Sequence, residues 1–157
     1  VGLALARQMS VLGFTVLQYD DRPNLPTLAK NEYATNLQII DYERVGEFLK
    51  TNPSDIVVLV SFSYRSDKIL LQQLYNQPFA YIGMMGSDHK IATLRKELAN
   101  EGISAQDLSH VFMPIGLPIY SKTAPEIAVS IAGQIILELN RGLPTGRAYW
   151  KTVWRER

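Results

Sequence analysis

Four short polar segments carry the residue types that could bind a small molecule, and each follows a predicted strand. Asp20 comes after the β-type run 14–19, eighteen residues beyond Gly2. In dinucleotide-binding folds, an acid about 20 residues beyond a glycine fingerprint bonds a ribose hydroxyl, and Gly2 could be the last glycine of that fingerprint. Asp21 and Arg22 complete the segment, and the Arg22 cation could also meet a phosphate. The competing interpretation is a loop of solvated acids.

The second segment is a predicted glycine turn between a strand and a helix. It contains Gly83, Gly86 and Ser87, and His89 and Lys90 would add hydrogen-bond donors. Glycine adopts positive φ, and a helix start offers free N–H groups, so a phosphate or carboxylate would suit this place. The spacing is not that of a Walker motif, and on spacing alone an ordinary turn capped by Ser87 is the favoured interpretation.

The remaining two segments follow the third and the last predicted strands. Ser61 lies in the first of them, and the second contains Pro114 and Gly116 and leads to Thr123. In open parallel sheets, ligands bind at the carboxyl ends of the strands. Four polar loops at that edge therefore predict a small-molecule crevice, with Gly2, Asp20, Asp21, Arg22, Ser61, Gly83, Gly86, Ser87, Pro114, Gly116 and Thr123 as candidate binding residues.

Composition limits the chemistry that these loops can do. The chain has 157 residues, no cysteine and two histidines, which excludes thiolate catalysis, disulfides and Cys-ligated metal sites. No Ser-His-Asp arrangement is plausible, and Glu126 is expected to be a helix-capping acid. A net charge of +1 gives no reason to expect nucleic acid or a membrane surface as partner. The sequence thus favours a binding protein without a catalytic set.

The elements that position these loops alternate along the chain. Helices are expected at 1–12, 43–50, 66–75, 90–100, 104–109 and 124–140, with Ser66 or Asp67 capping the third. Strands are expected at 14–19, 36–40, 55–62, 79–82 and 110–113, and the run 55–62 is apolar enough to be buried on both faces. This order predicts an α/β fold with a doubly wound parallel sheet over residues 1–142.

Two further expectations concern the ends of the chain. It starts inside a predicted helix, so we expect that the first, central strand of the sheet is missing and that the other strands flank a gap. Residues 143–157 form a basic, aromatic tail with Trp150 and Trp154 at i, i+4 spacing. These two side chains either pack back on the domain or contact a partner.

Four motifs in the same order resemble the xanthine dehydrogenase accessory (XdhC/CoxI) family. The run 81–87 (YIGMMGS) resembles its Y-[IV]-G-x-x-G-S segment, and 20–23 (DDRP) resembles its D-D-R-P. The start of the chain (VGLALA) resembles the tail of its G-x-G-H-V-G-x-A-L fingerprint, and 114–119 with 122–130 resembles a further family segment. The resemblance extends from residue 1 to about residue 142.

The resemblance implies a Rossmann-like C-terminal domain of a cytoplasmic accessory protein. Members of this family bind molybdenum cofactor, help its sulfuration with a cysteine desulfurase, and deliver it to an apo-molybdenum hydroxylase such as xanthine dehydrogenase. The resemblance also implies a homodimer. In this interpretation, helix starts at Ser87 and Thr123 hold phosphate, and Asp20 holds a ribose or pterin N–H.

A second class of function stays open at this point. An NAD(P)-dependent oxidoreductase or a nucleotide-sensing module would also use Asp20 at the end of its strand. An oxidoreductase would need a proton donor near the nicotinamide, for which His89 is the one weak candidate.

Overall fold

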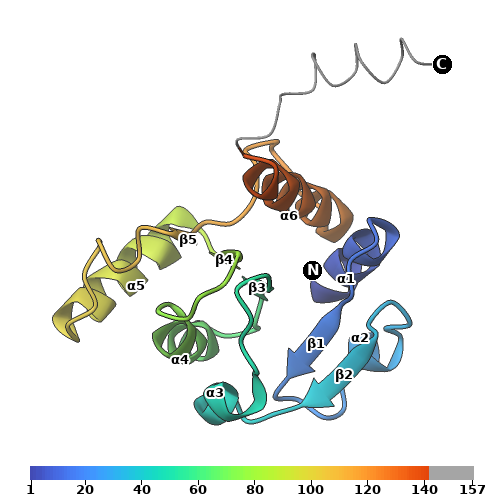
Figure 1. Cartoon of the computed structure of the whole chain (residues 1–157), viewed down its shortest axis with the longest axis horizontal. Coiled ribbons are helices and arrows are strands. Elements are labelled where there is room, and N and C mark those ends of the chain that lie inside the picture. The colour runs from blue at the N-terminus through green and yellow to red at the C-terminus, as the bar shows by residue number, and fades with distance from the viewer. Residues whose placement is uncertain (142–157) are drawn as a thin grey trace.

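A computed structural model describes residues 1–141 of the chain. Trp150, Trp154 and the rest of the predicted tail lie outside the described residues. Parallel strands form a middle layer between two layers of helices (Figure 1). The predicted doubly wound α/β architecture is confirmed.

Five short strands make up two separate parallel sheets. β1 (Leu17–Asp20) pairs with β2 (Asn36–Ile39), with Leu17 opposite Asn36. β4 (Tyr81–Met84) lies between β3 (Ile56–Leu59) and β5 (Val111–Phe112). The two sheets have the orders β1-β2 and β3-β4-β5, so β1 and β3 are not paired. The strands therefore flank a gap, as the sequence predicted.

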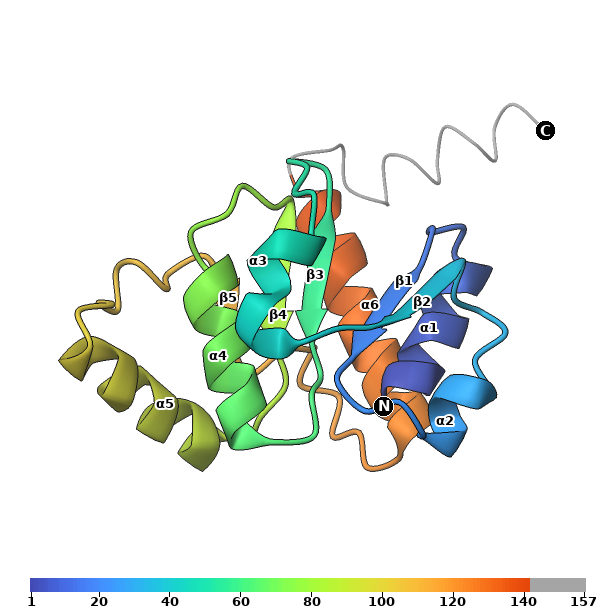
Figure 2. The same ribbon diagram turned by 90° about the horizontal axis from the view of Figure 1, so that it is seen from below.

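Within the described residues 1–141, six α-helices connect and cover the strands. They are α1 (Gly2–Val11), α2 (Pro26–Ala29), α3 (Val45–Phe48, after the 3₁₀ turn Tyr42–Arg44), α4 (Tyr64–Leu74), α5 (Asp88–Asn100) and α6 (Ala124–Leu139). α1 and α6 pack together on one side of the strands, and α3, α4 and α5 lie on the other (Figure 2). Within residues 1–141, no helix combines the length and the apolar character needed to cross a membrane.

Each face of the strands has its own apolar core. Ile82 and Met84 of β4 point to one cluster, with Leu71 of α4 and Leu94 of α5. Tyr81 of β4 points to the other cluster, whose remaining buried members are Leu5, Met9, Ala128, Ile131, Ala132 and Ile135 of α1 and α6. Side chains of a strand alternate between faces, so the single run of β4 supplies both cores.

Helix ends follow the sequence signals in most places. Thr123 and Glu126 form the predicted capping box of α6, and Ser87 caps α5. Gly13 follows α1 with φ of 87°, where its lack of a Cβ is needed. These three signals are local in sequence, which is why they could be predicted.

Four expectations about local structure are wrong. Ser63 caps α4 through the Ser66 N–H, so the predicted caps Ser66 and Asp67 lie inside the helix. Gly83 is part of strand β4 and not of a turn. Residues 104–109 form turns rather than a helix. The apolar run 55–62 was expected to be buried on both faces, but in β3 only Leu59 is buried, because one edge of this strand faces the gap.

Candidate functional site

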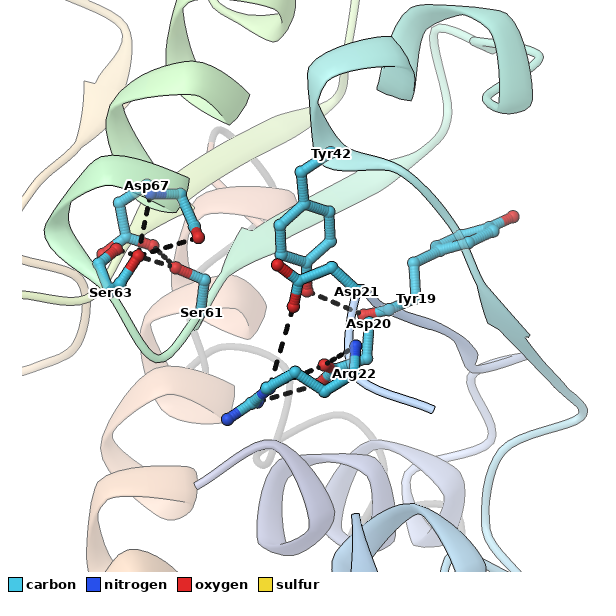
Figure 3. Close-up of polar contacts among 9 residues, drawn as sticks. Tyr19, Asp20, Asp21, Arg22, Tyr42, Ser61, Ser63 and Asp67 are labelled. Atoms are coloured by element: carbon cyan, nitrogen blue, oxygen red, sulfur yellow. Dashed lines mark hydrogen bonds and ion pairs between the residues drawn. The ribbon is translucent and has the colours of Figure 1, made fainter. Parts of the chain in front are cut away.

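The end of β1 holds a carboxylate–guanidinium pair (Figure 3). Asp20 is buried, and its Oδ1 accepts from the Arg22 backbone N–H at 3.0 Å and from Arg22 Nε at 2.9 Å. Its Oδ2 accepts from the second guanidinium nitrogen at 3.0 Å. This bidentate bond, together with the nearby Asp21 carboxylate, raises the pKa of Arg22. The Asp20 carboxylate is thus held in a fixed direction, and of its about four acceptor sites one, on Oδ2, is left for another donor.

Arg22 also connects the two sheets. Its guanidinium lies 5.3 Å from the centre of the Phe62 ring, which follows β3 and is 86% exposed.

The Tyr42 hydroxyl donates to the Tyr19 carbonyl oxygen of β1 at 3.4 Å. Burial, and then the carboxylates of Asp20 and Asp21, raise the pKa of Tyr42, so this hydroxyl stays protonated and remains a donor.

A second polar cluster lies at the carboxyl ends of β3 and β4. The Ser61 hydroxyl donates to one oxygen of Asp67, and Lys90 Nζ donates to the other. Asp67 is 1% exposed, whereas the Lys90 side chain is 26% exposed. The ion pair joins α4 to α5. The bond between Asp67 and Ser61 fixes Ser61 at the end of β3 (Figure 3). Because Asp67 is almost fully buried, this cluster orients Ser61 instead of offering a carboxylate to a ligand.

The gap between β1 and β3 is a cleft of about 810 Å³. Gly2, Asp20, Arg22 and Ser61 lie on its wall, so four of the predicted binding residues come together there. They come from the start of α1 and from the carboxyl ends of β1 and β3. Asp21 adjoins them through its contact with Arg22, at 3.7 Å from Nε.

Gly83, Gly86 and Ser87 lie away from the cleft wall. A Cβ at Gly83 would come 2.5 Å from Ile115 Cδ1, so this glycine is required for packing of the loop after β5. A Cβ at Gly86 would come 2.9 Å from Ile91 Cδ1 in the first turn of α5. Neither glycine has positive φ, the conformation that glycine would permit in the predicted phosphate turn. Ser87 accepts from the Lys90 N–H as a helix cap.

The loop after β5 is fastened to α6. The Gly116 N–H donates to Gln134 Oε1 at 2.8 Å, and Tyr81 of β4 donates its hydroxyl to the same oxygen at 2.7 Å. Gly116 has φ of 106°, and a Cβ there would clash with Ser130 Oγ. Pro114 follows a cis peptide bond in this loop. The loop thus closes tightly on α6 and does not border the cleft.

At the start of α6, the predicted phosphate donors have partners within the chain. The Glu126 carboxylate accepts from the N–H groups of Lys122 at 2.7 Å and of Thr123 at 2.9 Å. The Thr123 hydroxyl oxygen in turn accepts from the Glu126 N–H. A bound anion would have to displace a carboxylate here, so this helix start is less suited to phosphate than that of α1.

The start of α1 has the opposite character. Its N-cap residue is Val1, which makes no side-chain cap, and its first turn carries no acid. The first N–H groups of a helix have no partner within the helix, and they favour a bound anion. Gly2 lines the same cleft as Asp20 and Ser61.

Sequence reasoning missed the part played by Asp67. A signal was present, because Asp67 has the i, i+3, i+4 and i+7 spacing to Leu70, Leu71 and Leu74, the apolar face of α4. A carboxylate on a buried helix face needs a cation, and Lys90 supplies it. Within residues 1–141, no group of three or more metal-ligating side chains is present. The arrangement therefore suits binding through carboxylate, guanidinium and N–H groups.

Comparison with known proteins gives three findings. The family described as the XdhC Rossmann domain matches residues 1–135. The chain is 26% identical to the uncharacterized protein YqeB of Escherichia coli (strain K12), over 93% of this chain and 27% of that protein. It is 29% identical to a protein of Bacillus subtilis (strain 168) described as a probable xanthine dehydrogenase subunit, over 84% of this chain and 38% of that protein.

A solved structure is also similar. A crystal structure of a xanthine dehydrogenase from Bacillus halodurans matches with a TM-score of 0.72 and 27% identity, over 92% of this chain and 41% of that one. The chain thus spans less than half the length of each of these relatives.

Proposed function

The chain belongs to the XdhC family, whose Rossmann domain it contains, and from this premise we propose that it acts in the maturation of a xanthine dehydrogenase-type enzyme by binding molybdenum cofactor. The observation that carries the proposal is the meeting of Gly2, Asp20, Arg22 and Ser61 at one cleft. Gly2 begins α1, and the other three residues lie at the carboxyl ends of β1 and β3, where parallel sheets bind ligands.

The charges at the cleft fit a ligand that is rich in N–H donors. Asp20 and Asp21 bring two carboxylates against the one guanidinium of Arg22. Carboxylates accept hydrogen bonds, and the pyrimidine edge of a pterin offers an amino group and a ring N–H. Asp20 is the group that would hold this edge, because Arg22 fixes its direction.

The phosphate of the cofactor fits a different part of the same cleft. The uncapped N-terminus of α1 presents N–H groups beside Gly2, where a Cβ is absent. Ser61 lies on the cleft wall and could add a hydroxyl contact. A pterin phosphate placed along this line would have its donor edge at Asp20 and its phosphate at α1.

The role of a cofactor carrier does not require a catalytic base. A carrier needs a shaped site from which its cargo can leave, and hydrogen bonds supply reversible binding. We propose that the apo-hydroxylase and a cysteine desulfurase are partners of the complete protein, and that it works in the cytoplasm as a homodimer. These parts of the proposal rest on the family resemblance.

The test is a binding titration of the full chain with molybdenum cofactor released from a donor enzyme. Bound pterin is measured by fluorescence after oxidation of the protein fraction. Asp20→Asn should weaken binding roughly 10-fold to 100-fold, the loss expected for one hydrogen bond to a charged group. Glu32→Gln is the matched control, because it removes an exposed carboxylate that does not line the cleft and should leave binding unchanged.

A second candidate function rests on the position of Asp20. It is the last residue of β1 and lies on the cleft wall with Gly2, as a ribose-binding acid would. Parallel titrations with NAD and NADP therefore belong to the same experiment. Nucleotide binding that Asp20→Asn abolishes, with no pterin retained, would replace the carrier by a nicotinamide-nucleotide-binding module.

A further inference from the structure

Ser61 lines the cleft, but its hydroxyl proton is used inside the protein. We propose that Ser61 meets a ligand only as a hydrogen-bond acceptor, and that the cleft therefore selects ligands that donate a hydrogen bond at the end of β3. This inference rests on the proposed function, because it takes the cleft between β1 and β3 as the binding site. Asp67 is a positioning residue, since it acts through Ser61 and does not line the cleft itself.

The direction of the Ser61 proton follows from the two oxygens beside it. A serine hydroxyl has one proton to donate and two lone pairs that accept. Ser61 Oγ lies 2.5 Å from Asp67 Oδ1 and 3.1 Å from the Ser63 carbonyl oxygen (Figure 3). Neither a carboxylate nor a carbonyl oxygen carries a proton, so Ser61 is the donor in either contact. Asp67 is the stronger acceptor, because it is charged.

Lys90 keeps Asp67 in the form that accepts. The Lys90 ammonium donates to Asp67 Oδ2, and an ammonium has donors but no acceptor. The Asp67 side chain is 1% exposed, so its charge requires this partner. Ser61 and Lys90 thus both donate to Asp67, and rotation of the Ser61 hydroxyl cannot reverse this order.

The lone pairs of Ser61 Oγ are what this residue offers to a ligand. Among residues 1–141, no N–H or O–H group donates to this oxygen. A phosphate oxygen at this place would face the lone pairs with no proton between them, which is unfavourable. The phosphate of a ligand therefore belongs at the uncapped start of α1, and an N–H or hydroxyl belongs at Ser61.

Asp20 and Ser61 together define the class of ligand. Asp20 ends β1 and Ser61 follows β3, so these two acceptors lie on opposite sides of the cleft. A ligand held between them needs donors on two of its edges. A reduced pterin has such donors, because its pyrazine ring carries N–H groups in addition to the amino group and N–H of its pyrimidine ring. A fully oxidised pterin has pyrazine nitrogens that only accept.

The experiment titrates the full chain with tetrahydropterin and, separately, with fully oxidised pterin, by calorimetry without oxygen. The two probes share their pyrimidine edge, so a contact at Asp20 is common to both. The ratio of the dissociation constant of pterin to that of tetrahydropterin measures the preference for a donor on the pyrazine ring. In Ser61→Ala, this ratio should fall at least about fivefold, because a hydrogen bond is gained with one probe and left unmade with the other.

Asp67→Asn tests the direction of the Ser61 proton. The amide oxygen of the new side chain has to face the Lys90 ammonium, so its NH₂ group faces Ser61 and donates to it. Ser61 Oγ then accepts within the chain, and its proton becomes available to a ligand. The ratio of the two dissociation constants should again fall at least about fivefold. A loss of stability alone would weaken the binding of both probes equally and leave their ratio unchanged.

Glu97→Gln is the matched control. Glu97 accepts from Lys68 Nζ at 2.9 Å, so this variant also replaces a carboxylate by an amide in an ion pair between α4 and α5. Glu97 does not line the cleft, and its replacement should leave the ratio at the wild-type value.

The possible failures are distinguishable. A ratio that neither Ser61→Ala nor Asp67→Asn changes, while Asp20→Asn weakens the binding of both probes, would overturn this inference and leave the proposed function standing. If Ser61→Ala lowers the ratio and Asp67→Asn does not, the positioning role of Asp67 is wrong. Failure of both probes to bind the wild-type chain would contradict the proposed function itself, and this inference with it.

Discussion

β3 and β4 are adjacent strands with similar apolar sequences, yet their environments differ. All four residues of β4 are buried, and this strand pairs on both sides. One of four residues of β3 is buried, and its other edge faces the cleft. Helices cover both strands, so the missing neighbour accounts for the difference. A parallel strand in this fold depends on its lateral neighbours as much as on the helices above and below it.

The same contrast extends to the polar groups at the strand ends. In the closed half of the molecule, around β4, the Asp67 side chain is 1% exposed, and its ion pair with Lys90 joins α4 to α5. In the open half, around β1, Asp20 and Arg22 line the cleft, and the Arg22 side chain is 39% exposed. Polar groups in the closed half thus hold the fold, and those in the open half are available to a ligand.

The largest expected effect separates these two carboxylates. Asp67→Asn leaves the Lys90 ammonium without its charge partner, and we expect a loss of about 2–3 kcal/mol in the free energy of unfolding. This is below the range for fully buried pairs, because Lys90 keeps some contact with water. Asp20→Asn should cost about 1 kcal/mol. Urea unfolding followed by circular dichroism measures the free energy of unfolding of both variants. Equal losses would contradict the distinction between the closed and the open half.

The next comparison uses two glycines. Gly83→Ala places a methyl group against Ile115 in the closed half and should cost about 1–3 kcal/mol of stability. Gly2→Ala places the same group in ordinary contact distance at the open cleft, within a helix, and should be neutral or stabilising by up to about 1 kcal/mol. Thermal unfolding of the two variants tests this, and a destabilised Gly2→Ala protein would show that the cleft is narrower than the structure indicates.

A smaller effect follows from removing one methyl group on each of the two strands. Ile82→Val in β4 should cost about 1 kcal/mol, since the side chain is 2% exposed. Ile56→Val in β3 should cost less than about 0.5 kcal/mol, because its side chain is partly exposed. Chemical denaturation measures the difference in unfolding free energy, with the slope of free energy against denaturant concentration the same for both variants. If a strand is supplied to the cleft, the cost of Ile56→Val should rise toward that of Ile82→Val.

The smallest effect concerns the start of α6. The N–H groups of Lys122 and Thr123 lower the pKa of Glu126 below its ordinary value of 4.5. The capping contact therefore contributes stability above pH 4.5, which is lost as pH falls through the lower value in the folded protein. Glu126→Gln should reduce the melting temperature slightly at about pH 6, and this reduction should shrink as the pH is lowered toward about 3. A constant difference across this range would exclude titration of Glu126 as its cause.

Sequence patterns located most elements because their signals are local. The capping box at Thr123, the Ser87 cap and the glycine after α1 are each contained within a few residues. The gap between β1 and β3 also followed from the order of helices and strands. The short helix α2 was not predicted, because four residues are too few to show a helical periodicity.

The candidate site was predictable only in part. Gly2, Asp20, Arg22 and Ser61 follow from the rule for strand ends, and they do line one cleft. The roles of Gly83 and Gly116 depend on Ile115 and Ser130, which are distant contacts that no local pattern reports. Tertiary packing decides whether a glycine makes room for a ligand or for a neighbouring side chain. Residue type and spacing were therefore not sufficient to assign the roles of Gly83 and Gly116.

The packing of α1 against α6 has a consequence for synthesis on the ribosome. β1–β2, β3–β4 and β4–β5 each join strands that are consecutive in the chain, so each pair can form as its second strand emerges. Leu5 and Met9 belong to a core whose buried members otherwise come mostly from α6. α6 can cover these two side chains only after nearly the whole domain has been translated. Until then, they form an exposed apolar surface to which a chaperone could bind.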